Sequence, residues 1–383
     1  MARDRMEQSC YVASLKYSPV MWNHGRGLGE PVGHEGFPIR YLLASGYDWL
    51  CEDSELDVDL ISLGNDSNPL LSLLSFFTSG APRKLRNLFR THPPSTLLFV
   101  NFNPLIDRIV VRIARRANPR ARVVALFHEP HTEEKLVYGW KRALLLTAYE
   151  FLSKRMVRSS DAVILPSENA GDTFRRFIPS FRGDSRVIPL VYVDVACREN
   201  LDRRFVSFVG QIGNAHQKGL DLFIEMVEEN VRRSGGLAFQ LVTGQSPRRL
   251  LESLSAEARA SLRVVHADQL TDEAISRAIR ESLVVVLLQR RVMQSGALPM
   301  ALMNGTPVLV SRLEGFTEFV EEGRTARILP VDSSLDERFD AIGEIRENID
   351  FMVPLCRRSY EEKFDSRCVA EHVPFLVGRP IEK

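Results

Sequence analysis

The chain has 383 residues, of which 44% are hydrophobic and 26% charged. This length favours two domains over a single core, and this composition excludes a disordered chain. Because no apolar run is long enough to span a bilayer and residues 1–10 lack the apolar stretch of a signal peptide, we expect a cytoplasmic protein. The five cysteines are scattered and form no CxxC pair, which argues against a zinc ribbon or a disulfide framework.

The charge is unevenly distributed along the chain, although the net charge is only +1. Residues 1–190 carry 25 basic and 20 acidic side chains, and the remainder carries 25 and 29. Between residues 83 and 158 there are 16 basic and 5 acidic side chains. This band fits either solvated helix faces or an anionic partner, such as the anionic inner face of a membrane. A nucleic acid is not expected, because no nucleic-acid-binding motif accompanies the charge.

The first half of the chain alternates strands with helices. Apolar runs at 11–16, 38–43, 57–62, 95–101, 122–127 and 161–165 predict strands, and residues 69–77, 105–116 and 137–158 predict helices. This alternation is typical of a parallel sheet covered on both faces. After the first strand, HGRGLG is expected to form a glycine loop containing Gly25 and Gly27, because Pro31 and Gly33 argue against a long helix.

His128 directly follows the predicted strand 122–127, within the sequence ALFHEPH. Ligands of parallel sheets bind beyond the carboxyl ends of strands, so this position suits a catalytic side chain. A histidine there is also compatible with a purely structural, hydrogen-bonded role. The sequence leaves both interpretations open.

After a stretch with little periodicity, the same pattern of strands and helices begins again. Strands are predicted at 204–209, 239–243, 262–266, 283–288, 308–310 and 327–330, and helices at 221–231, 271–280, 297–303, 335–349 and 359–376. We therefore predict an N-terminal domain at 1–190, a linker at 191–203 and a C-terminal domain at 204–365. The C-terminal helix, 366–383, is expected to pack back on the N-terminal domain.

Two loops of the second domain have the character of anion sites. The strand 204–209 ends in a glycine turn that begins at Gly210, and Lys218 follows at the start of a helix. The strand 283–288 leads into Ser295 and Gly296, where Ser295 is a good N-cap for the helix 297–303. Backbone N–H groups at a helix start, together with an ammonium group, suit a diphosphate. The same residues would also suit an ordinary connection between a strand and a helix that binds no ligand.

The runs FVGQIGNAHQKGLDLFIEMV and VVVLLQRRVMQSGALPMALMNGTPVLVSRLEGFTEFVEEG resemble the donor domain of the retaining, family-four glycosyltransferases of GT-B fold. The resemblance implies an α/β fold with two Rossmann-like domains facing across a cleft. It implies transfer of a hexosyl unit, with retention, from a nucleoside diphosphate sugar to a hydroxyl of a glycan, glycolipid or small molecule, as in polysaccharide biosynthesis. No metal or other cofactor is implied, because the nucleotide sugar is a co-substrate.

The resemblance also assigns roles to individual residues. Lys218 would contact the donor diphosphate, and Gly210 and Gln211 would form the turn beside it. Ser295 and Gly296 would offer backbone groups to the phosphate or the sugar. His128 would lie near the reacting sugar. Gly25 and Gly27 would form the loop near the phosphate and the acceptor.

Three positions depart from the family pattern. Gln211 stands where the family usually has a basic residue, and Val292 and Met300 stand where it has two glutamates. A carboxylate that orders the ribose or stabilises charge is therefore missing from its expected place. One alternative is an inactive GT-B scaffold that partners an active glycosyltransferase. Another is a GT-B epimerase, which would need acid and base carboxylates that the sequence does not show convincingly.

Overall fold

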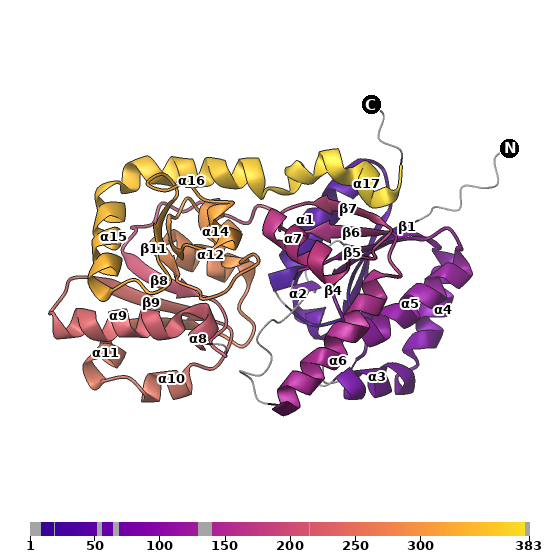
Figure 1. Ribbon diagram of the computed structural model, residues 1–383, viewed down its shortest axis with the longest axis horizontal. Coiled ribbons are helices and arrows are strands. Elements are labelled where there is room, and N and C mark those ends of the chain that lie inside the picture. The colour runs from indigo at the N-terminus through magenta and orange to yellow at the C-terminus, as the bar shows by residue number, and fades with distance from the viewer. Residues whose placement is uncertain are drawn as a thin grey trace. The chain divides into compact units, whose positions relative to one another are not determined.

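The computed structural model describes residues 9–18, 20–51, 56–63, 69–128, 140–213 and 215–379. The chain divides into two compact units (Figure 1). Unit 1 comprises Met1–Val193 with Ser366–Lys383, and unit 2 comprises Asp194–Asp365. The segment 191–203, expected to be a linker, is thus divided between the two units.

Unit 1 contains a seven-stranded parallel sheet in the order β3-β2-β1-β4-β5-β6-β7. Its central strands are almost wholly buried, which explains their near-continuous apolar sequences. The strands are β1 (Ser9–Ser14), β2 (Ile39–Ala44), β3 (Val58–Ile61), β4 (Pro94–Asn101), β5 (Arg122–Leu126), β6 (Ala162–Leu165) and β7 (Asp184–Val187).

The helices of unit 1 connect these strands, and the end of the chain adds a further helical segment. In chain order they are α1 (Val20–His34), η1 (Ser45–Tyr47), α2 (Asp48–Cys51), α3 (Pro69–Thr78), α4 (Ala81–Thr91), α5 (Pro104–Ala117), α6 (Trp140–Val157), α7 (Glu168–Phe177), η3 (Ser366–His372) and α17 (Val373–Val377).

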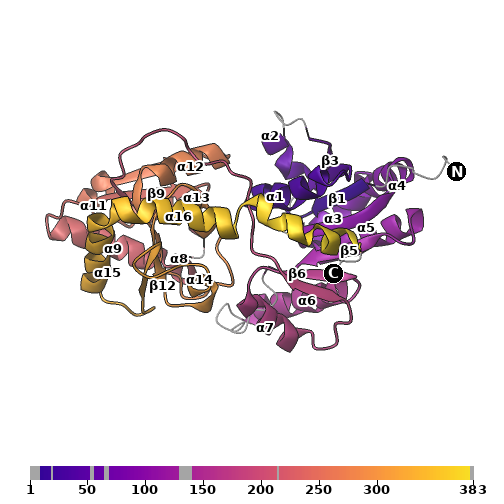
Figure 2. The ribbon, with the colours of Figure 1, turned by 90° about the horizontal axis from the view of Figure 1, so that it is seen from above.

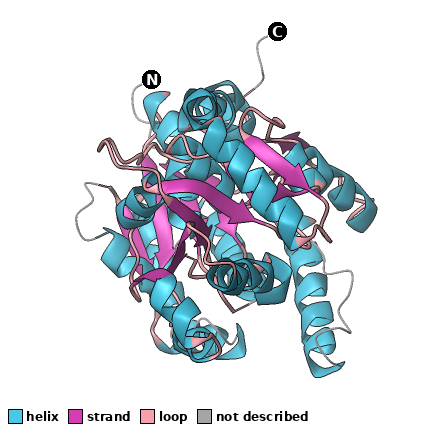
Figure 3. Cartoon of the chain, turned by 90° about the vertical axis from the view of Figure 1, so that its left-hand side faces the viewer, coloured by secondary structure: helices cyan, strands magenta, loops and turns pink. Residues whose placement is uncertain are grey.

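Unit 2 contains a six-stranded parallel sheet in the order β10-β9-β8-β11-β12-β13. Helices cover the sheet on both sides, as the cartoon in Figure 3 shows. The strands are β8 (Phe205–Val209), β9 (Ala238–Thr243), β10 (Leu262–His266), β11 (Ser282–Leu287), β12 (Val308–Ser311) and β13 (Ala326–Leu329).

The helices of unit 2 range from 4 to 15 residues in length. They are α8 (Ala215–Lys218), α9 (Leu220–Arg232), α10 (Arg248–Glu252), α11 (Ala256–Ser261), α12 (Asp272–Arg280), α13 (Ala297–Met303), α14 (Glu314–Thr317), α15 (Leu335–Glu347) and α16 (Ile349–Lys363). Throughout the described part of the chain, no helix combines the length and the apolar character that crossing a membrane requires.

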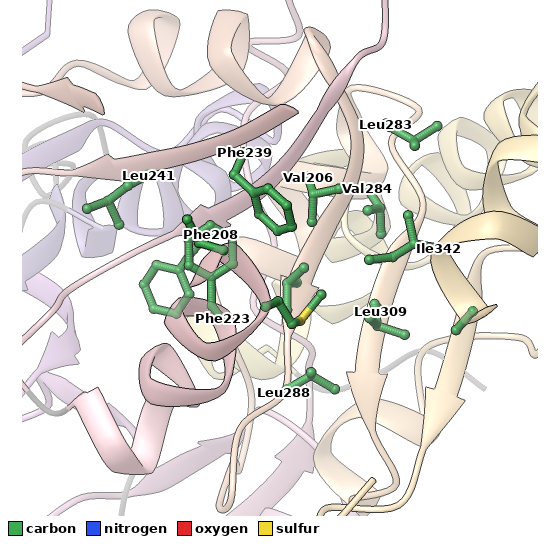
Figure 4. Close-up of a cluster of buried hydrophobic side chains, with 14 of the residues drawn as sticks. Val206, Phe208, Phe223, Phe239, Leu241, Leu283, Val284, Leu288, Leu309 and Ile342 are labelled. Atoms are coloured by element: carbon green, nitrogen blue, oxygen red, sulfur yellow. The ribbon is translucent and has the colours of Figure 1, made fainter. Parts of the chain in front are cut away.

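Aromatic side chains form the centre of the core of unit 2. Phe223 of α9 lies between Phe208 of β8 and Phe239 of β9, with ring centroids 5.7 and 5.6 Å away (Figure 4). Met226 and Val227 lie on the same buried side of α9, as the helical spacing predicts. Edge and tilted ring contacts of this kind add to the stabilisation from buried area. The packing fixes α9 on the sheet, and with it the loop that precedes the helix.

The chain crosses between the units twice, and both crossings leave unit 1 at one place. Ser366 N–H donates to Tyr192 O at 3.2 Å. The segment after Ser366 lies beside α1 (Figure 2), and the Phe375 ring lies 5.2 Å from the Arg186 guanidinium. The expected helix at 359–376 is wrong in detail: α16 ends at Lys363, and a 3-10 helix follows.

Candidate functional site

The strand order of unit 2 reverses between β8 and β11. From β8 the chain moves outward through β9 to β10, and it then returns to add β11, β12 and β13 on the other side. In open parallel sheets of this kind, ligands bind beyond the carboxyl ends of the two strands at the reversal. The loops that follow β8 and β11 meet at that edge. They contain Lys218 and Ser295, the donor-site residues expected from the sequence.

A chain of side-chain hydrogen bonds joins the two loops. Lys218 Nζ donates to Gln289 Oε1 at 3.5 Å, and Gln289 Nε2 donates to Ser295 Oγ at 3.4 Å. Gln289 and Ser295 are buried, and Lys218 is half-buried. Both hydrogen bonds are long and therefore weak. An anionic oxygen would bind the Lys218 ammonium more strongly than the neutral amide of Gln289 does.

Arg290, the residue after Gln289, also joins the loops that follow β8 and β11. Its N–H donates to Gln217 O at 3.0 Å, and its guanidinium donates to Asp221 Oδ1 at 2.8 Å. Burial by itself would raise the pKa of Asp221, but hydrogen bonds from Arg290 and His216 outweigh burial and lower that pKa. Asp221 is therefore a stable anion paired with Arg290, at the start of α9.

Gly219 separates α8 from α9 and lies directly against Leu288. Its φ of 71° is left-handed, which glycine adopts without the steric cost that other residues have. The backbone of the β8 loop can therefore approach the end of β11 closely. This approach brings Lys218 within reach of Gln289.

The turn after β8 is closed by Gln245, which follows β9. Gln245 Oε1 accepts hydrogen bonds from Ile212 N–H at 2.8 Å and Gly213 N–H at 2.9 Å. Gly210 has a φ of +146°, and its N–H donates to Val242 O. Consecutive N–H groups directed at one oxygen form a concavity that suits an anion. Gln211 lies in this turn and is exposed.

The second expected anion site differs from the prediction in one respect. The helix α13 has the predicted bounds, and Gly305 follows it with a φ of +65°, as a C′ glycine does. The N-cap is Gly296, however, and not Ser295. Ser295 lies one residue earlier, where its hydroxyl accepts from Gln289 and its carbonyl accepts from Leu298 N–H at 3.2 Å. Its side chain therefore joins the two loops and does not cap the helix.

Val292 and Met300 occupy buried positions, 9% and 6% exposed. Gly315 lies against the backbone of this loop, and a Cβ on Gly315 would be 2.6 Å from Val292 O. An ionised carboxylate at either buried position would need a partner to offset its desolvation. Apolar residues avoid this cost, so the absence of the family's glutamates is compatible with the packing.

In unit 1, His128 follows β5 by two residues and is half-buried. Its charge acts on His24 of α1 and contributes to lowering the pKa of that residue. His24 is fully buried, and its Nδ1 donates to Val191 O at 2.8 Å. Burial lowers the pKa of His24 to about 4, with a small contribution from the His128 charge and against the hydrogen bond to Val191, so His24 is neutral at pH 7.

The expected glycine loop at Gly25 and Gly27 is wrong. Both residues lie inside α1, which continues through Pro31 to His34. A Cβ on Gly27 would lie 2.9 Å from Val191 O, and one on Gly25 would lie 3.4 Å from Val12 Cγ1. The glycines allow α1 to approach β1 and the crossing segment closely. In this structure they lie in a helix and serve packing.

Sequence reasoning missed Gln289, Arg290, Gln245 and His24. Gln289 and Arg290 carried a weak signal, because polar residues directly after a buried strand mark its carboxyl end. Gln245 carried no signal in the sequence, since the residues that it contacts lie on another loop. Together the site offers an ammonium group, a polar chain that holds it and turns rich in backbone N–H groups. Such a set can bind an anion and stabilise negative charge that develops on it.

Residues 203–348 match the family model described as Glycosyl transferases group 1. Among curated proteins, none matches this chain in sequence. Solved structures share the fold over nearly the whole chain. Sucrose-phosphate synthase from Thermosynechococcus elongatus is 16% identical with a TM-score of 0.71, covering 96% of this chain and 98% of its own.

Two further structures show the same similarity. Alr3699/HepE from Anabaena, in complex with UDP-glucose, is 12% identical with a TM-score of 0.70, covering 97% of this chain and 99% of its own. A glycosyltransferase from Rickettsia africae ESF-5 is 9% identical with a TM-score of 0.69, covering 98% of this chain and 100% of its own. The predicted fold is thereby confirmed: the chain has the GT-B fold, built from two Rossmann-like units.

Proposed function

We propose that this protein transfers a hexosyl unit from a nucleoside diphosphate sugar to an acceptor hydroxyl, with retention of configuration. The observation that carries the proposal is the chain from Lys218 through Gln289 to Ser295 at the strand-order reversal of unit 2. Its place in the fold is where nucleotides bind in sheets of this order. The family match over 203–348 covers the same loops.

The donor diphosphate would replace the amide oxygen of Gln289 as the acceptor for Lys218 Nζ. Backbone N–H groups of Gln211 and of Gly296 would bind further phosphate oxygens. When the bond from the anomeric carbon to the diphosphate breaks, negative charge grows on the leaving oxygen. Lys218 would stabilise that charge more in the transition state than in the ground state.

The remaining steps follow from the proposed reaction. The acceptor oxygen forms its bond to the anomeric carbon on the face that the diphosphate leaves, and the acceptor proton leaves with the diphosphate. We assign His128 to the sugar as an orienting or polarising group. His24 of α1 stays neutral at pH 7, because burial lowers its pKa, so it adds no positive charge to this part of unit 1.

Uridine is the base we propose for the donor. Alr3699/HepE was solved in complex with UDP-glucose, and sucrose-phosphate synthase has the same fold as this chain. The acceptor class we propose is a glycan, a glycolipid or a small molecule. For unit 1 we also propose peripheral contact with an anionic membrane.

A catalytically inactive GT-B scaffold is the second candidate. The buried apolar pair Val292 and Met300, in place of two glutamates, favours it. In this alternative the polar chain at Lys218 would bind a nucleotide sugar, or a partner protein, without turnover.

Thermal shift with UDP, UDP-sugars, GDP and GDP-sugars tests donor binding, because a ligand of the folded state raises the unfolding temperature. We expect a UDP-dependent shift that Lys218→Ala abolishes. Arg249→Ala, which removes an exposed cation of unit 2, should keep the shift. Equal shifts for the wild type and Lys218→Ala would overturn the proposed donor site.

Turnover separates the two candidates. Release of UDP from the sugar that gives the largest shift, with water or added glycans as acceptors, supports the transferase. NMR of the anomeric proton in donor and product then reports retention or inversion. UDP-sugar binding with no turnover, together with a glycosyltransferase that co-purifies, would favour the scaffold.

A further inference from the structure

Exposed apolar side chains are concentrated on two helices of unit 1. Among the described residues, eight large hydrophobic side chains are exposed, and seven of them belong to α3 and α6. The eighth is Phe351, on α16 of unit 2. The seven are Leu71, Leu74, Phe77, Trp140, Leu144, Leu145 and Phe151. Single exposed hydrophobics are ordinary, but a concentration of this kind marks an interaction surface.

The spacing of these side chains makes continuous stripes. Leu71, Leu74 and Phe77 recur every three residues, so they share one side of α3. On α6, Trp140, Leu144 and Phe151 fall on one side of the helix by the same rule. The other side of α6 is also apolar, with Met156 and Val157 buried. A helix that is apolar on both sides is stable in the folded protein when both sides are covered.

α3 and α6 belong to one group of packed helices. α3 contacts α4 and α5, and α5 contacts both α4 and α6. In Figure 1, α3 and the beginning of α6 lie along the lower border of unit 1. We call the exposed surface of these four helices the α3–α6 face.

The charges of the α3–α6 face have one sign. The described side chains of the four helices include ten basic residues, four each on α4 and α5 and two on α6, and two acidic residues. Both acidic residues, Asp107 and Glu150, are buried. On α4, the exposed cations are Arg83, Lys84, Arg86 and Arg90.

The arginines of α5 crowd one another. Arg108, Arg112, Arg115 and Arg116 line a hollow of about 490 Å³ together with Val111 and Ser159. Burial lowers the pKa of Arg108, and the nearby charges of Arg155 and Arg112 lower it further. The Asp161 carboxylate pairs with Arg115 at 2.9 Å and offsets part of this charge. The other arginines still repel one another at this density, and a further anion would relieve that repulsion.

We propose that the α3–α6 face docks on an anionic lipid bilayer, with the apolar side chains of α3 and α6 entering the interface and the basic residues binding headgroups. This locates the peripheral contact proposed above, and it does not depend on donor transfer. Apolar side chains beside many cations are the composition of a segment that lies in a membrane interface. Each basic residue near an anionic surface adds to the attraction.

A second copy of the chain fits this surface poorly. A symmetric dimer through the α3–α6 face would bring like-charged helices together without an exposed carboxylate of the four helices to pair them. A nucleic acid would neutralise the charge but would not cover the exposed leucines. A bilayer surface satisfies both features at once.

Flotation of the full chain with lipid vesicles tests the proposal. We expect binding to phosphatidylcholine vesicles that contain about one-third phosphatidylglycerol, and binding that weakens as salt rises. Pure phosphatidylcholine vesicles should bind at least about tenfold less protein. The variants Leu74→Ser with Phe77→Ser, and Leu144→Ser with Phe151→Ser, should each lose about tenfold or more in binding.

Two more variants separate charge from apolar contact. Arg83→Glu with Arg86→Glu and Arg90→Glu should remove the preference for anionic vesicles. Phe351→Ser removes an equally exposed phenyl group from unit 2 and should float like the wild type. All these residues are exposed, so thermal unfolding should stay close to that of the wild type.

Several outcomes would overturn the membrane proposal. They are a wild type that stays in solution at low salt, flotation unchanged in both apolar double variants, and an equal loss in Phe351→Ser. A wild-type dimer that the apolar variants dissociate in sedimentation would assign the face to a second copy instead. The UDP thermal shift of the same samples reports on unit 2, so failure of flotation with an intact shift rejects this proposal alone.

Discussion

Gly219 lies so close to Leu288 that a Cβ on the glycine would be 1.9 Å from the carbonyl oxygen of Leu288. This contact joins the loop after β8 to the end of β11. Because Lys218 precedes Gly219 and Gln289 follows Leu288, the contact also sets the distance between the ammonium group and the amide that accepts from it. The donor site that we propose thus depends on a backbone approach that only glycine permits.

Gly219→Ala should therefore destabilise unit 2 by at least about 3 kcal/mol, because the new methyl group meets backbone and the φ is left-handed. Urea denaturation measures the change. Gly236→Ala is the matched control, since a Cβ there meets nothing within 4 Å. Similar stabilities for the two variants would show that the loop relaxes freely, and that the contact does not constrain the site.

Gln289→Glu should weaken UDP binding by at least about tenfold, because a carboxylate would pair with Lys218 and repel a diphosphate. Titration calorimetry with UDP measures the affinity. Gln269→Glu places the same charge on an exposed loop of unit 2 and should leave the affinity within about twofold of the wild type. Unchanged affinity in Gln289→Glu would separate Gln289 from the diphosphate.

The stability of unit 1 should fall as pH drops from 6.5 to 4. His24 has an ordinary pKa of 6.5 and a folded-state pKa of about 4, so between these values the unfolded chain binds more protons than the folded one. The neutral, buried His24 contributes about 3 kcal/mol above pH 6.5, and this contribution is lost as pH falls through 4.

Chemical denaturation at several pH values, for the wild type and for His24→Gln, isolates this contribution. The variant should show a shallower fall of the unfolding free energy over the same range, since it lacks the titrating imidazole. Parallel curves would mean that other groups cause the acid sensitivity.

Gly27→Ala should destabilise unit 1 by about 1 kcal/mol or more, although alanine favours a helix, because its methyl group would meet the carbonyl of Val191 at 2.9 Å. Hydrogen exchange at Val193 N–H, which donates to Asn23 Oδ1 at 2.6 Å, should quicken as the crossing segment loosens. Gly33→Ala, in the same helix and with its nearest side chain at 3.4 Å, should be neutral or stabilising. Equal effects at both glycines would assign the change to helix propensity alone.

Local sequence predicted the features that depend on neighbours along the chain. The strand at 262–266 and the helix at 297–303 match the structure residue for residue, because apolar runs and flanking turn residues define them. The glycine turn and Lys218 after the strand 204–209 also indicated which edge of the sheet carries the proposed site. These signals depend on a few neighbouring residues, so they can be recognised without knowledge of the fold.

The sequence did not predict the features that depend on close approach between segments distant in the chain. The glycines of α1 indicated a loop, but they lie within a helix because the crossing segment packs against them. Ser295 indicated a helix cap, but its hydroxyl serves Gln289 from the neighbouring loop. The apolar residues of α3 indicated a helix but not that one side of it is exposed. In each case, distant segments compete with the local preference.

By itself, the sequence determined two α/β halves with the GT-B pattern and a cation after the first strand of the second half. Periodicity and residue type suffice for this, since burial of strands and helices imposes them on the chain. Only the tertiary structure decided which side chain holds Lys218, why α1 needs glycine and which apolar surface stays uncovered. Those outcomes depend on distances between segments far apart in the chain, which hydrophobic patterning leaves open.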